Sequence, residues 1–594
     1  MNANRIRELL DFIYGENEAA EIFPGLMEIV GKPAPAAAAE RAITNKDALL
    51  ISYGDMLSAG GGGGEETALR RLGRFLSKWN DGDAGFSYLH LLPFHPYSSD
   101  DGFSVIDYRV IDPKLGGWDD VEKLGGHFKT VFDFVINHGS AQSEWFKKFL
   151  AGEPPYQNWY ATRPDNYDWS KVFRPRTHPL FTAFTKSDGS KVNVWTTFSA
   201  DQVDYDFSRQ EVVLEFIRIF LDYCKRGAKM LRLDAIAFMW KEDGTACMHH
   251  PKTHAFVKLL RAIIDYLQLP VLLLTETNVP HRDNISYFGG DLAIDVPGKA
   301  PDMEEAHMVY NFALPPLVLH AAVSGDALPL RRWAESLPAL PAGNCFLNFL
   351  ASHDGVGLGA AKGLIDDAAF AETLAFAKTQ GALVSMKSTP AGEIPYELNC
   401  SWADMVAPES LGSVEVQARA FLATYAVAMA LPGLPAVYFH SWIGSRAWKE
   451  GPSLWGYNRA INREKPAIDS VEKELGEKGS FRAHIMEGFA RMLEFKAREP
   501  AFAPDVPCKV LQVEPAGVFA LCRQLSEAEG VLCLHNFSRQ AVKFKVDLPP
   551  FKREISLDAH ATAWVSYRGG GDIDLSDHGI ANDPGSSHLT VLEF

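Results

Sequence analysis

Short apolar runs alternate with longer helical patterns through most of this chain, and no other feature of the sequence constrains its fold as strongly. Runs that are apolar on both faces are typical of a parallel sheet covered by helices, and eight such strands are enough to close a barrel. We therefore expect an α/β protein built on a (β/α)₈ TIM barrel. The eight runs are LLISYG from Leu49, FSYLHLLP from Phe86, TVFDFVIN from Thr130, MLRLDAIAF from Met230, VLLLTET from Val271, HMVYNF from His307, FLNFLASHD from Phe346 and LPAVYFHS from Leu434.

The barrel accounts for only part of the 594 residues. Residues 1–46 indicate a helical N-terminal extension that ends in the Ala/Pro run PAPAAAA, and residues 47–500 indicate the barrel. Two connections are too long for simple loops, so we expect an inserted domain B at about 139–206 and an active-site loop region at about 355–415. Residues 501–594 contain short alternating runs typical of a small antiparallel β-domain, for which we expect a structural role.

The composition excludes several classes of protein. A net charge of −17 without a basic patch excludes nucleic acid as the main partner. No segment reaches the roughly 18 consecutive apolar residues of a membrane span, and the N-terminal segment lacks the apolar core of a signal peptide. The seven cysteines are scattered without a CxxC pair, which favours reduced thiols. We expect a cytoplasmic protein with no membrane partner.

The sequence indicates neither a cofactor nor a metal site. The glycines at 61–64 precede a helical pattern without the Lys-Ser/Thr of a phosphate-binding loop, and they are better explained as a flexible segment. The histidines of HHPKTH (249–254) are interrupted by Pro251, which favours solvent-facing side chains over a metal cluster. The sequence does not constrain the oligomeric state.

Three carboxylates stand at the ends of three predicted strands, where barrels of this type carry their catalytic groups. Asp234 shares a strand face with Arg232, a neighbour that keeps a carboxylate ionised and so suits a nucleophile. Glu276 follows four apolar residues and Thr275, so an apolar wall could favour its protonated form, as a general acid requires. Asp354 could support positive charge developing on a sugar ring.

The structural explanation for any one of these acids is an ion pair, which is the commoner role of a buried Asp beside an Arg. Three acids at three strand ends are harder to explain in that way, because buried carboxylates without partners or chemistry are unfavourable. We therefore interpret Asp234, Glu276 and Asp354 together as a catalytic group.

Four segments, in order, resemble the four signature regions of the α-amylase family. The resemblance covers about residues 47–480. It implies a retaining double displacement, in which Asp234 attacks the anomeric carbon, Glu276 protonates the leaving oxygen and Asp354 stabilises the oxocarbenium-like transition state. The segments are DFVINH (133–138), LRLDAIAF (231–238), TETN (275–278) and FLASHD (349–354).

Further segments resemble the sucrose phosphorylases and their relatives within that family. This resemblance implies that the substrates are a small glucoside and inorganic phosphate, and that Asp100 and Arg459 clamp the far hydroxyl of a single terminal glucose. It implies that His138, Arg232 and His353 complete the glucose site. It also implies that Phe103 or Phe198 offers an apolar face to sugar rings or to the acceptor. The segments are LLPFHPYSSDDGFSVIDY (91–108), WTTFSADQVDYDF (195–207), YNFALPPLVLH (310–320) and NRAINR (458–463).

The phosphate site is expected in domain B. RPRTHP (174–179) resembles the Arg-Pro-Arg stretch of the phosphorylases, which implies that Arg176, with Arg174 as its neighbour, binds phosphate. A solvated or purely structural arginine is the alternative.

The acceptor side departs from the sucrose phosphorylases. Asn278 stands where those enzymes have a histidine, and IPYELNCSW (394–402) stands where they have a Tyr-Gln-containing loop. The stretches TETNVPH, ASHDG and PYELN more closely resemble the glucosylglycerate phosphorylases, which release D-glycerate. An anionic acceptor needs donors, and Asn278, His281 and Lys387 are the candidates, although a lysine in a long loop is by default solvated.

Two groups of alternatives remain open. The first is another enzyme of the same group: a sucrose phosphorylase, another glucosyl-polyol phosphorylase or a hydrolase. The second is a non-catalytic amylase-like binding protein. The presence of all three carboxylates argues against the second alternative.

Overall fold

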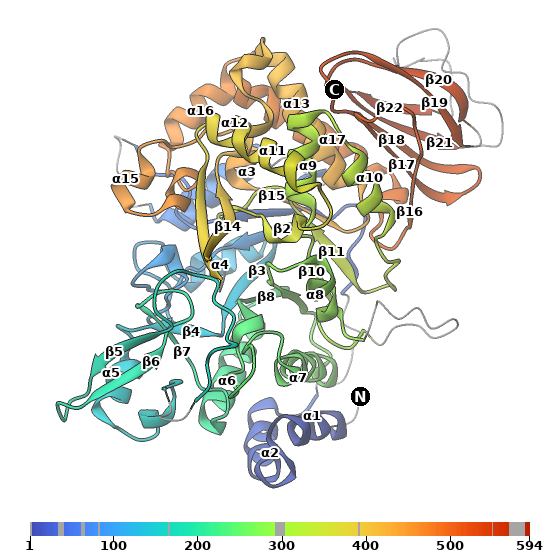
Figure 1. The fold of residues 1–594 in the computed structure, drawn as a ribbon. Helices are drawn as coiled ribbons and strands as arrows, with labels where there is room; N and C mark the ends of the chain where they lie inside the picture. Colours follow the sequence, from blue (N-terminus) through green and yellow to red (C-terminus); the bar gives the residue numbers. More distant parts are fainter. Residues whose placement is uncertain are drawn as a thin grey trace.

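A computed structural model of the chain describes residues 3–33, 41–60, 66–80, 84–163, 167–290, 303–389, 392–548, 551–568 and 589–593 (Figure 1). Most of the Ala/Pro run and the glycines at 61–64 lie outside the described residues.

Eight parallel strands of the described chain close into a barrel in the order β1, β15, β11, β10, β9, β8, β3, β2. Each of the eight apolar runs coincides with one of these strands, except that β3 and β11 begin one residue before their runs, so the predicted TIM barrel is confirmed. The strands are β1 (Leu49–Ser52), β2 (Tyr88–Leu91), β3 (Lys129–Val135), β8 (Met230–Asp234), β9 (Leu272–Thr275), β10 (Met308–Tyr310), β11 (Cys345–Asn348) and β15 (Leu434–Tyr438).

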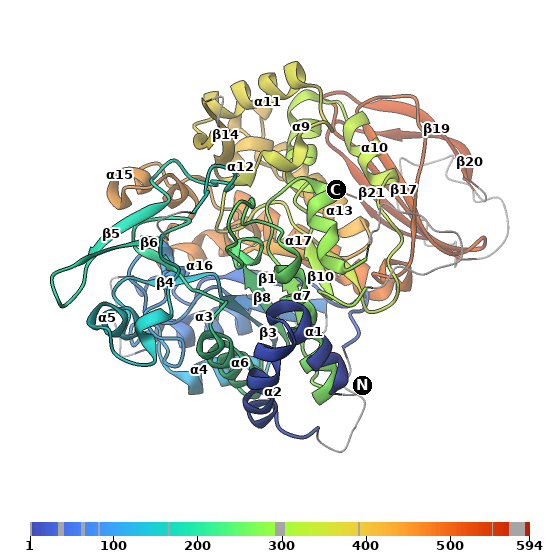
Figure 2. The same cartoon turned by 60° about the horizontal axis from the view of Figure 1, so that its bottom comes forward.

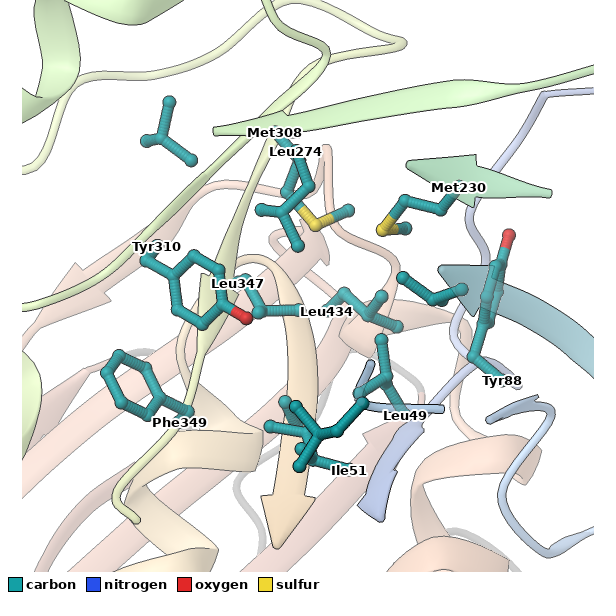
Figure 3. Packing of buried hydrophobic residues seen from close by; sticks show 14 of the residues in the cluster. Leu49, Ile51, Tyr88, Met230, Leu274, Met308, Tyr310, Leu347, Phe349 and Leu434 are labelled. Atoms are coloured by element: carbon teal, nitrogen blue, oxygen red, sulfur yellow. The ribbon is translucent and has the colours of Figure 1, made fainter. Parts of the chain in front are cut away.

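Apolar side chains fill the interior of the barrel. In Figure 3, side chains from six different strands point toward one another, and all six are fully buried. Because the interior is packed rather than hollow, a ligand site has to form above the strand ends. The six side chains are Leu49, Met230, Leu274, Met308, Leu347 and Leu434.

Helices cover the outside of the barrel (Figure 1). Their apolar faces pack inward: in α6, for example, Val213, Phe216 and Phe220 are fully buried. The helices outside the N-terminal extension are α3 (Ala68–Trp79), α4 (Trp118–Gly125), α5 (Glu144–Ala151), α6 (Gln210–Lys225), α7 (Pro251–Leu267), α8 (His281–Ile285), α9 (Leu314–Ser324), α10 (Leu328–Glu335), α11 (Asp367–Thr379), α12 (Trp402–Val406), α13 (Val414–Ala430), α14 (Phe439–Trp442), α15 (Gly451–Trp455), α16 (Ile468–Gly476) and α17 (Phe481–Arg498).

The N-terminal segment forms a helix pair, α1 (Asn4–Tyr14) and α2 (Glu16–Val30). Helix α1 packs on α7 and α2 packs on α6, as Figure 2 shows. The hydroxyl of Tyr14 donates to the carbonyl of Phe207 over 2.9 Å, which ties the pair to the barrel.

The first long insertion leaves the barrel at β4 (His138–Ser140) and returns at β7 (Gln202–Asp204), two strands that pair with each other. Between them lie α5 and the hairpin of β5 (Phe181–Thr185) and β6 (Lys191–Trp195). Because β4 pairs with β7, with His138 opposite Asp204, the two ends of the inserted segment lie side by side. The inserted segment is therefore anchored at the barrel rim.

The second long insertion contains regular structure where the sequence predicted loops. Strands β12 (Val356–Gly357), β14 (Gly392–Asn399) and β13 (Leu383–Thr389) form an antiparallel sheet. Pairing between such segments is non-local and leaves little trace in local hydrophobic spacing.

The C-terminal part is antiparallel, as predicted. It consists of a five-stranded sheet and the hairpin of β19 (Val542–Leu548) and β20 (Phe551–Leu557). Buried arginines join it to the barrel: Arg331 of α10 donates to the carbonyls of Val513 and Val518 over 2.7 Å, and Arg523 donates to the carbonyl of Ala430 over 2.9 Å. The five strands are β16 (Cys508–Val510), β17 (Val518–Ser526), β18 (Glu529–Asn536), β21 (Thr562–Arg568) and β22 (Leu589–Glu593).

None of the helices in the described part of the chain combines the length and the apolar character needed to cross a bilayer.

Candidate active site

A cavity lies at the carboxyl ends of the barrel strands. Its walls include Phe198 from the first insertion, Tyr396 from β14 and Tyr310 at the end of β10. The volume of the cavity is about 90 Å³. Because TIM barrels carry their active sites at this end, the cavity is the candidate active site.

All but two of the predicted site residues line this cavity. Side chains that are far apart in the sequence therefore share one space, as expected when the strand ends of a closed barrel meet. The lining residues are Asp100, Phe103, His138, Arg176, Phe198, Arg232, Asp234, Glu276, Asn278, His353, Asp354 and Arg459.

Asp234 and Glu276 stand on neighbouring strands. Asp234 is the last residue of β8, and Glu276 directly follows β9, which pairs with β8. The residue after Asp234, Ala235, has a left-handed backbone with φ of 51°, an unfavourable conformation for alanine. The N–H of Ala235 donates to Oε2 of Glu276 over 3.2 Å. The residue that directly follows Asp234 therefore also holds the carboxylate of Glu276.

Arg232 holds Asp234 from below. Its Nη1 donates to Oδ1 of Asp234 over 2.8 Å and also contacts Oδ1 of Asp133. Asp133 accepts a second hydrogen bond from Nε2 of His90 over 2.9 Å. Arg232, Asp133 and His90 are all at most 4% exposed, so a buried chain of hydrogen bonds orients the Asp234 carboxylate.

Two arginines surround Asp354. Nη1 of Arg459 forms an ion pair with Oδ1 of Asp354, and Nη2 of Arg463 lies 3.7 Å from the same oxygen. Arg459 also makes a bidentate pair with Glu397, with distances of 2.9 and 2.7 Å. Asp354 is therefore placed in strongly positive surroundings.

The three carboxylates have different proton affinities. Burial raises the pKa of Asp234 and Glu276; Arg232 opposes both shifts. Burial would also raise the pKa of Asp354, but Arg459 and Arg463 outweigh it and lower this pKa below the ordinary value. Asp354 is therefore ionised, whereas Asp234 and Glu276 both have raised pKa values and compete for a proton.

Aromatic rings and a neutral histidine form the remaining walls. Phe103 stacks on His353 with ring centroids 4.9 Å apart and planes at 5°. Burial, with Arg463 and Arg232, holds the pKa of His353 well below its usual range, so the ring is neutral. His138 donates from Nε2 to the carbonyl of Phe103 over 2.9 Å and lies beside Phe198.

Two predicted acceptor ligands do not reach the cavity. His281 is the first residue of α8, and its ring packs against Trp333 and Phe346, with centroids 6.2 Å away in both cases. The turn into α8 places His281 outside the residues that line the cavity, and its role as an acceptor ligand stays a prediction. Lys387 lies on β13 behind the wall, with its ammonium 5.2 Å from the ring of Phe173 and 5.4 Å from that of Tyr396.

The family model described as "Alpha amylase, catalytic domain" matches residues 83–354 of this chain. A curated relative, the glucosylglycerate phosphorylase of Spirochaeta thermophila, is 45% identical over 544 residues, which cover 90% of this chain and 89% of the relative. The chain belongs to the phosphorylase branch of the α-amylase family.

More distant members of the family agree with this assignment. The sucrose phosphorylase of Agrobacterium vitis is 28% identical over 76% of this chain and 88% of that protein. The crystal structure of sucrose 6F-phosphate phosphorylase from Thermoanaerobacter thermosaccharolyticum superposes with a TM-score of 0.70 over 88% of this chain and 100% of the other, at 22% identity. At that identity the likeness concerns the fold of the family.

Asp100 and Arg459, the expected clamp on the far glucose hydroxyl, both line the cavity, but Arg459 is not the arginine beside Asp100. The arginine next to Asp100 is Arg463, whose Nη1 lies 3.5 Å from Oδ1 of Asp100 and 3.3 Å from Oδ2 of Asp101. Both arginines belong to the family-like segment NRAINR, and Arg463 is fully buried. The two arginines stand four positions apart in the sequence, and the segment itself does not indicate which one points to Asp100.

Other cavity residues lay within recognised family segments without being singled out. Gln202, Tyr396 and Glu397 line the cavity, and Asp133 supports Arg232 from below. The only sequence signal for these residues was that they lie in segments that resemble the family. Such a segment indicates a region of the site, but not which of its side chains face a ligand. In the described part of the chain, no group of three or more His, Cys, Asp or Glu side chains is arranged to hold a metal ion.

Proposed function

We propose that the chain catalyses the reversible phosphorolysis of 2-O-α-glucosyl-D-glycerate to α-glucose 1-phosphate and D-glycerate. The similarity to the phosphorylase of Spirochaeta thermophila supports the substrate. The observation that carries the chemistry is the convergence of Asp234, Glu276 and Asp354 on one cavity that Arg176 also lines.

The first displacement transfers the glucosyl group to the protein. Asp234 attacks the anomeric carbon, the bond to the glycerate oxygen breaks, and Glu276 gives its proton to that oxygen. We assign the shared proton to Glu276, because Asp234 accepts from Arg232 over 2.8 Å, whereas Glu276 accepts only a 3.2 Å bond from Ala235. Asp354, ionised between Arg459 and Arg463, stabilises the positive charge that develops on the sugar ring.

The second displacement releases the product. Phosphate enters the space that glycerate has left, Glu276 accepts its proton, and the phosphate oxygen attacks the anomeric carbon as the bond to Asp234 breaks. Two inversions return the α configuration. Arg176 supports this step: its guanidinium lies 5.6 Å from the ring of Phe198 and 5.5 Å from that of Tyr396, and its Nη1 donates to the carbonyl of Pro175 over 3.2 Å rather than to a carboxylate. Its charge is thus available to an anion.

Unsatisfied polar atoms in the wall are suited to sugar and acceptor hydroxyls. Oδ1 of Asn278 and Nδ1 of His353 are buried without a hydrogen-bond partner in the described structure. Buried polar groups are normally paired, so each favours a ligand that supplies the missing partner. Asn278 lies two residues beyond Glu276, next to the group that protonates the leaving oxygen, and we assign it to the acceptor.

The remaining enzymatic alternatives are a sucrose phosphorylase, another glucosyl-polyol phosphorylase and a hydrolase of the same group. Asparagine rather than histidine at 278 favours glycerate, and so does the greater similarity to the glucosylglycerate enzyme. We also infer a cytoplasmic location, which the seven unpaired cysteines support.

The test compares glucosylglycerate with sucrose. Release of glucose 1-phosphate is measured for each, with and without inorganic phosphate, and we expect phosphate-dependent release from glucosylglycerate alone. Release from sucrose at a similar rate would replace the proposed substrate, and phosphate-independent release of free glucose would identify a hydrolase.

A further inference from the structure

The loop that follows Asp354 contains three glycines, Gly355, Gly357 and Gly359, in different surroundings. A Cβ atom added to Gly357 would lie 2.5 Å from Nδ2 and 2.7 Å from Cγ of Asn278, and closer still to its Oδ1. A Cβ atom on Gly359, two residues further on, would meet nothing within 4 Å.

The contact at Gly357 is a matter of space, not of backbone conformation. None of the three glycines has the positive φ that L-residues avoid, so alanine could adopt the same backbone at each position. Non-bonded carbon and nitrogen atoms do not approach to 2.5 Å, so a side chain at 357 would displace the Asn278 amide.

The position of Gly357 is itself fixed from the other side. Gly357 belongs to β12, which pairs with β14 in the register Val356 to Leu398 and Gly357 to Glu397. Glu397 in turn is held by Arg459 in the bidentate pair described above. The loop therefore cannot retreat from Asn278 without breaking strand pairing, so the amide would have to move toward the cavity.

We propose that Gly357 is a specificity-determining residue, because the absence of a side chain there sets how far the Asn278 amide reaches into the acceptor side of the cavity. The proposal deepens the proposed function and rests on it. Gly357 contacts no reacting atom and acts through Asn278. With alanine at 357 the acceptor space shrinks, while the glucose side, built from Asp100, Arg463 and His353, keeps its shape.

The experiment is a double-mutant cycle between Gly357→Ala and Asn278→Ala in the full chain, run in the synthetic direction with α-glucose 1-phosphate as donor. We expect Gly357→Ala to raise the KM for D-glycerate about tenfold, the effect of roughly one methylene in a pocket. The KM for α-glucosyl fluoride in its slow hydrolysis without acceptor should stay unchanged, because its leaving group is a single atom and the glucose side alone holds this donor. The smaller hydroxy acid glycolate should gain relative to D-glycerate.

The cycle and its control decide the outcome. In the Asn278→Ala background the amide is gone, so Gly357→Ala should have no further effect on acceptor KM. Gly359→Ala is the matched control and should behave as the wild type. An acceptor KM unchanged by Gly357→Ala, or raised equally in both backgrounds, overturns the proposal.

Two complications are covered by the same variants. If Gly357→Ala alone does not fold, the double variant should fold, because the crowding is removed; a double variant that also fails to fold overturns the proposal. If the wild type turns out to use another acceptor, the proposed function fails, and the same cycle measured with that acceptor still decides the role of Gly357.

Discussion

Nη1 of Arg232 donates to Oδ1 of Asp234 over 2.8 Å and contacts the buried carboxylate of Asp133 with the same nitrogen. One guanidinium thus positions the carboxylate that we assign as nucleophile, and Asp133 and His90 position the guanidinium.

Replacement of the assigned nucleophile should abolish catalysis without unfolding the protein. Asp234→Asn keeps the shape of the side chain and removes its negative charge, so kcat should fall by about three orders of magnitude or more. Steady-state release of glucose 1-phosphate measures this, with Asp188→Asn, on the exposed turn between β5 and β6, as the control. Activity within tenfold of the wild type in Asp234→Asn would remove Asp234 from this role.

The pH profile should report the protonated Glu276. Burial raises the pKa of Glu276 above its ordinary value of about 4.3, and the reaction needs the acid form, so activity should be present below this pKa and lost as pH rises through it. α-Glucosyl fluoride needs no proton on its leaving group. With this substrate the alkaline fall in kcat/KM should disappear, and Glu276→Gln should still form the glucosyl intermediate. An identical alkaline limb for both substrates would argue against Glu276 as the acid.

Arg176 should matter for phosphate more than for the glucoside. Arg176→Ala removes the cation and should raise the KM for phosphate by about tenfold to a hundredfold, with the KM for glucosylglycerate little changed. Arg176→Lys keeps the positive charge but lacks the planar guanidinium, so its KM for phosphate should lie between those of the wild type and Arg176→Ala. Equal losses for phosphate and glucoside would mean that Arg176 shapes the wall instead of binding the anion.

The stability of the fold should depend on pH through Lys496. Burial lowers the pKa of Lys496 to about 7, and its ammonium donates to the carbonyls of Asn45 and Asp47 over 2.8 and 2.9 Å. In the unfolded chain the lysine keeps its proton up to a pKa of about 10.4. Between these two values the unfolded state binds more protons, so the free energy of unfolding rises with pH, by about 1.4 kcal/mol per pH unit for this group.

Lys496→Met removes this dependence. The difference in the free energy of unfolding between wild type and variant, from denaturant titrations at about pH 7.5 and about pH 9.5, should therefore shift in favour of the wild type at the higher pH. A difference that is the same at both values would show that Lys496 keeps its proton in the folded protein.

The barrel and the three carboxylates could be predicted from the sequence because their signals are local. A strand buried on both faces needs a continuous apolar run, and each of the eight runs coincides with a barrel strand to within one residue at its start. Asp234 and Glu276 interrupt such runs at the point where the strand leaves the core, so a polar residue there faces the open end of the barrel.

Only the tertiary structure decided which side chains meet above the barrel. Arg459 and Arg463 stand four residues apart in one segment, yet Arg459 pairs with Glu397 of β14 and Arg463 lies beside Asp100. His281, five residues after Glu276, turns away into the core with the start of α8. These outcomes depend on packing between elements that are far apart in the sequence, and local spacing carries no information about such packing. The sequence by itself therefore determined the barrel and its acids, whereas the fold in three dimensions decided the partners of those acids and the shape of the acceptor site.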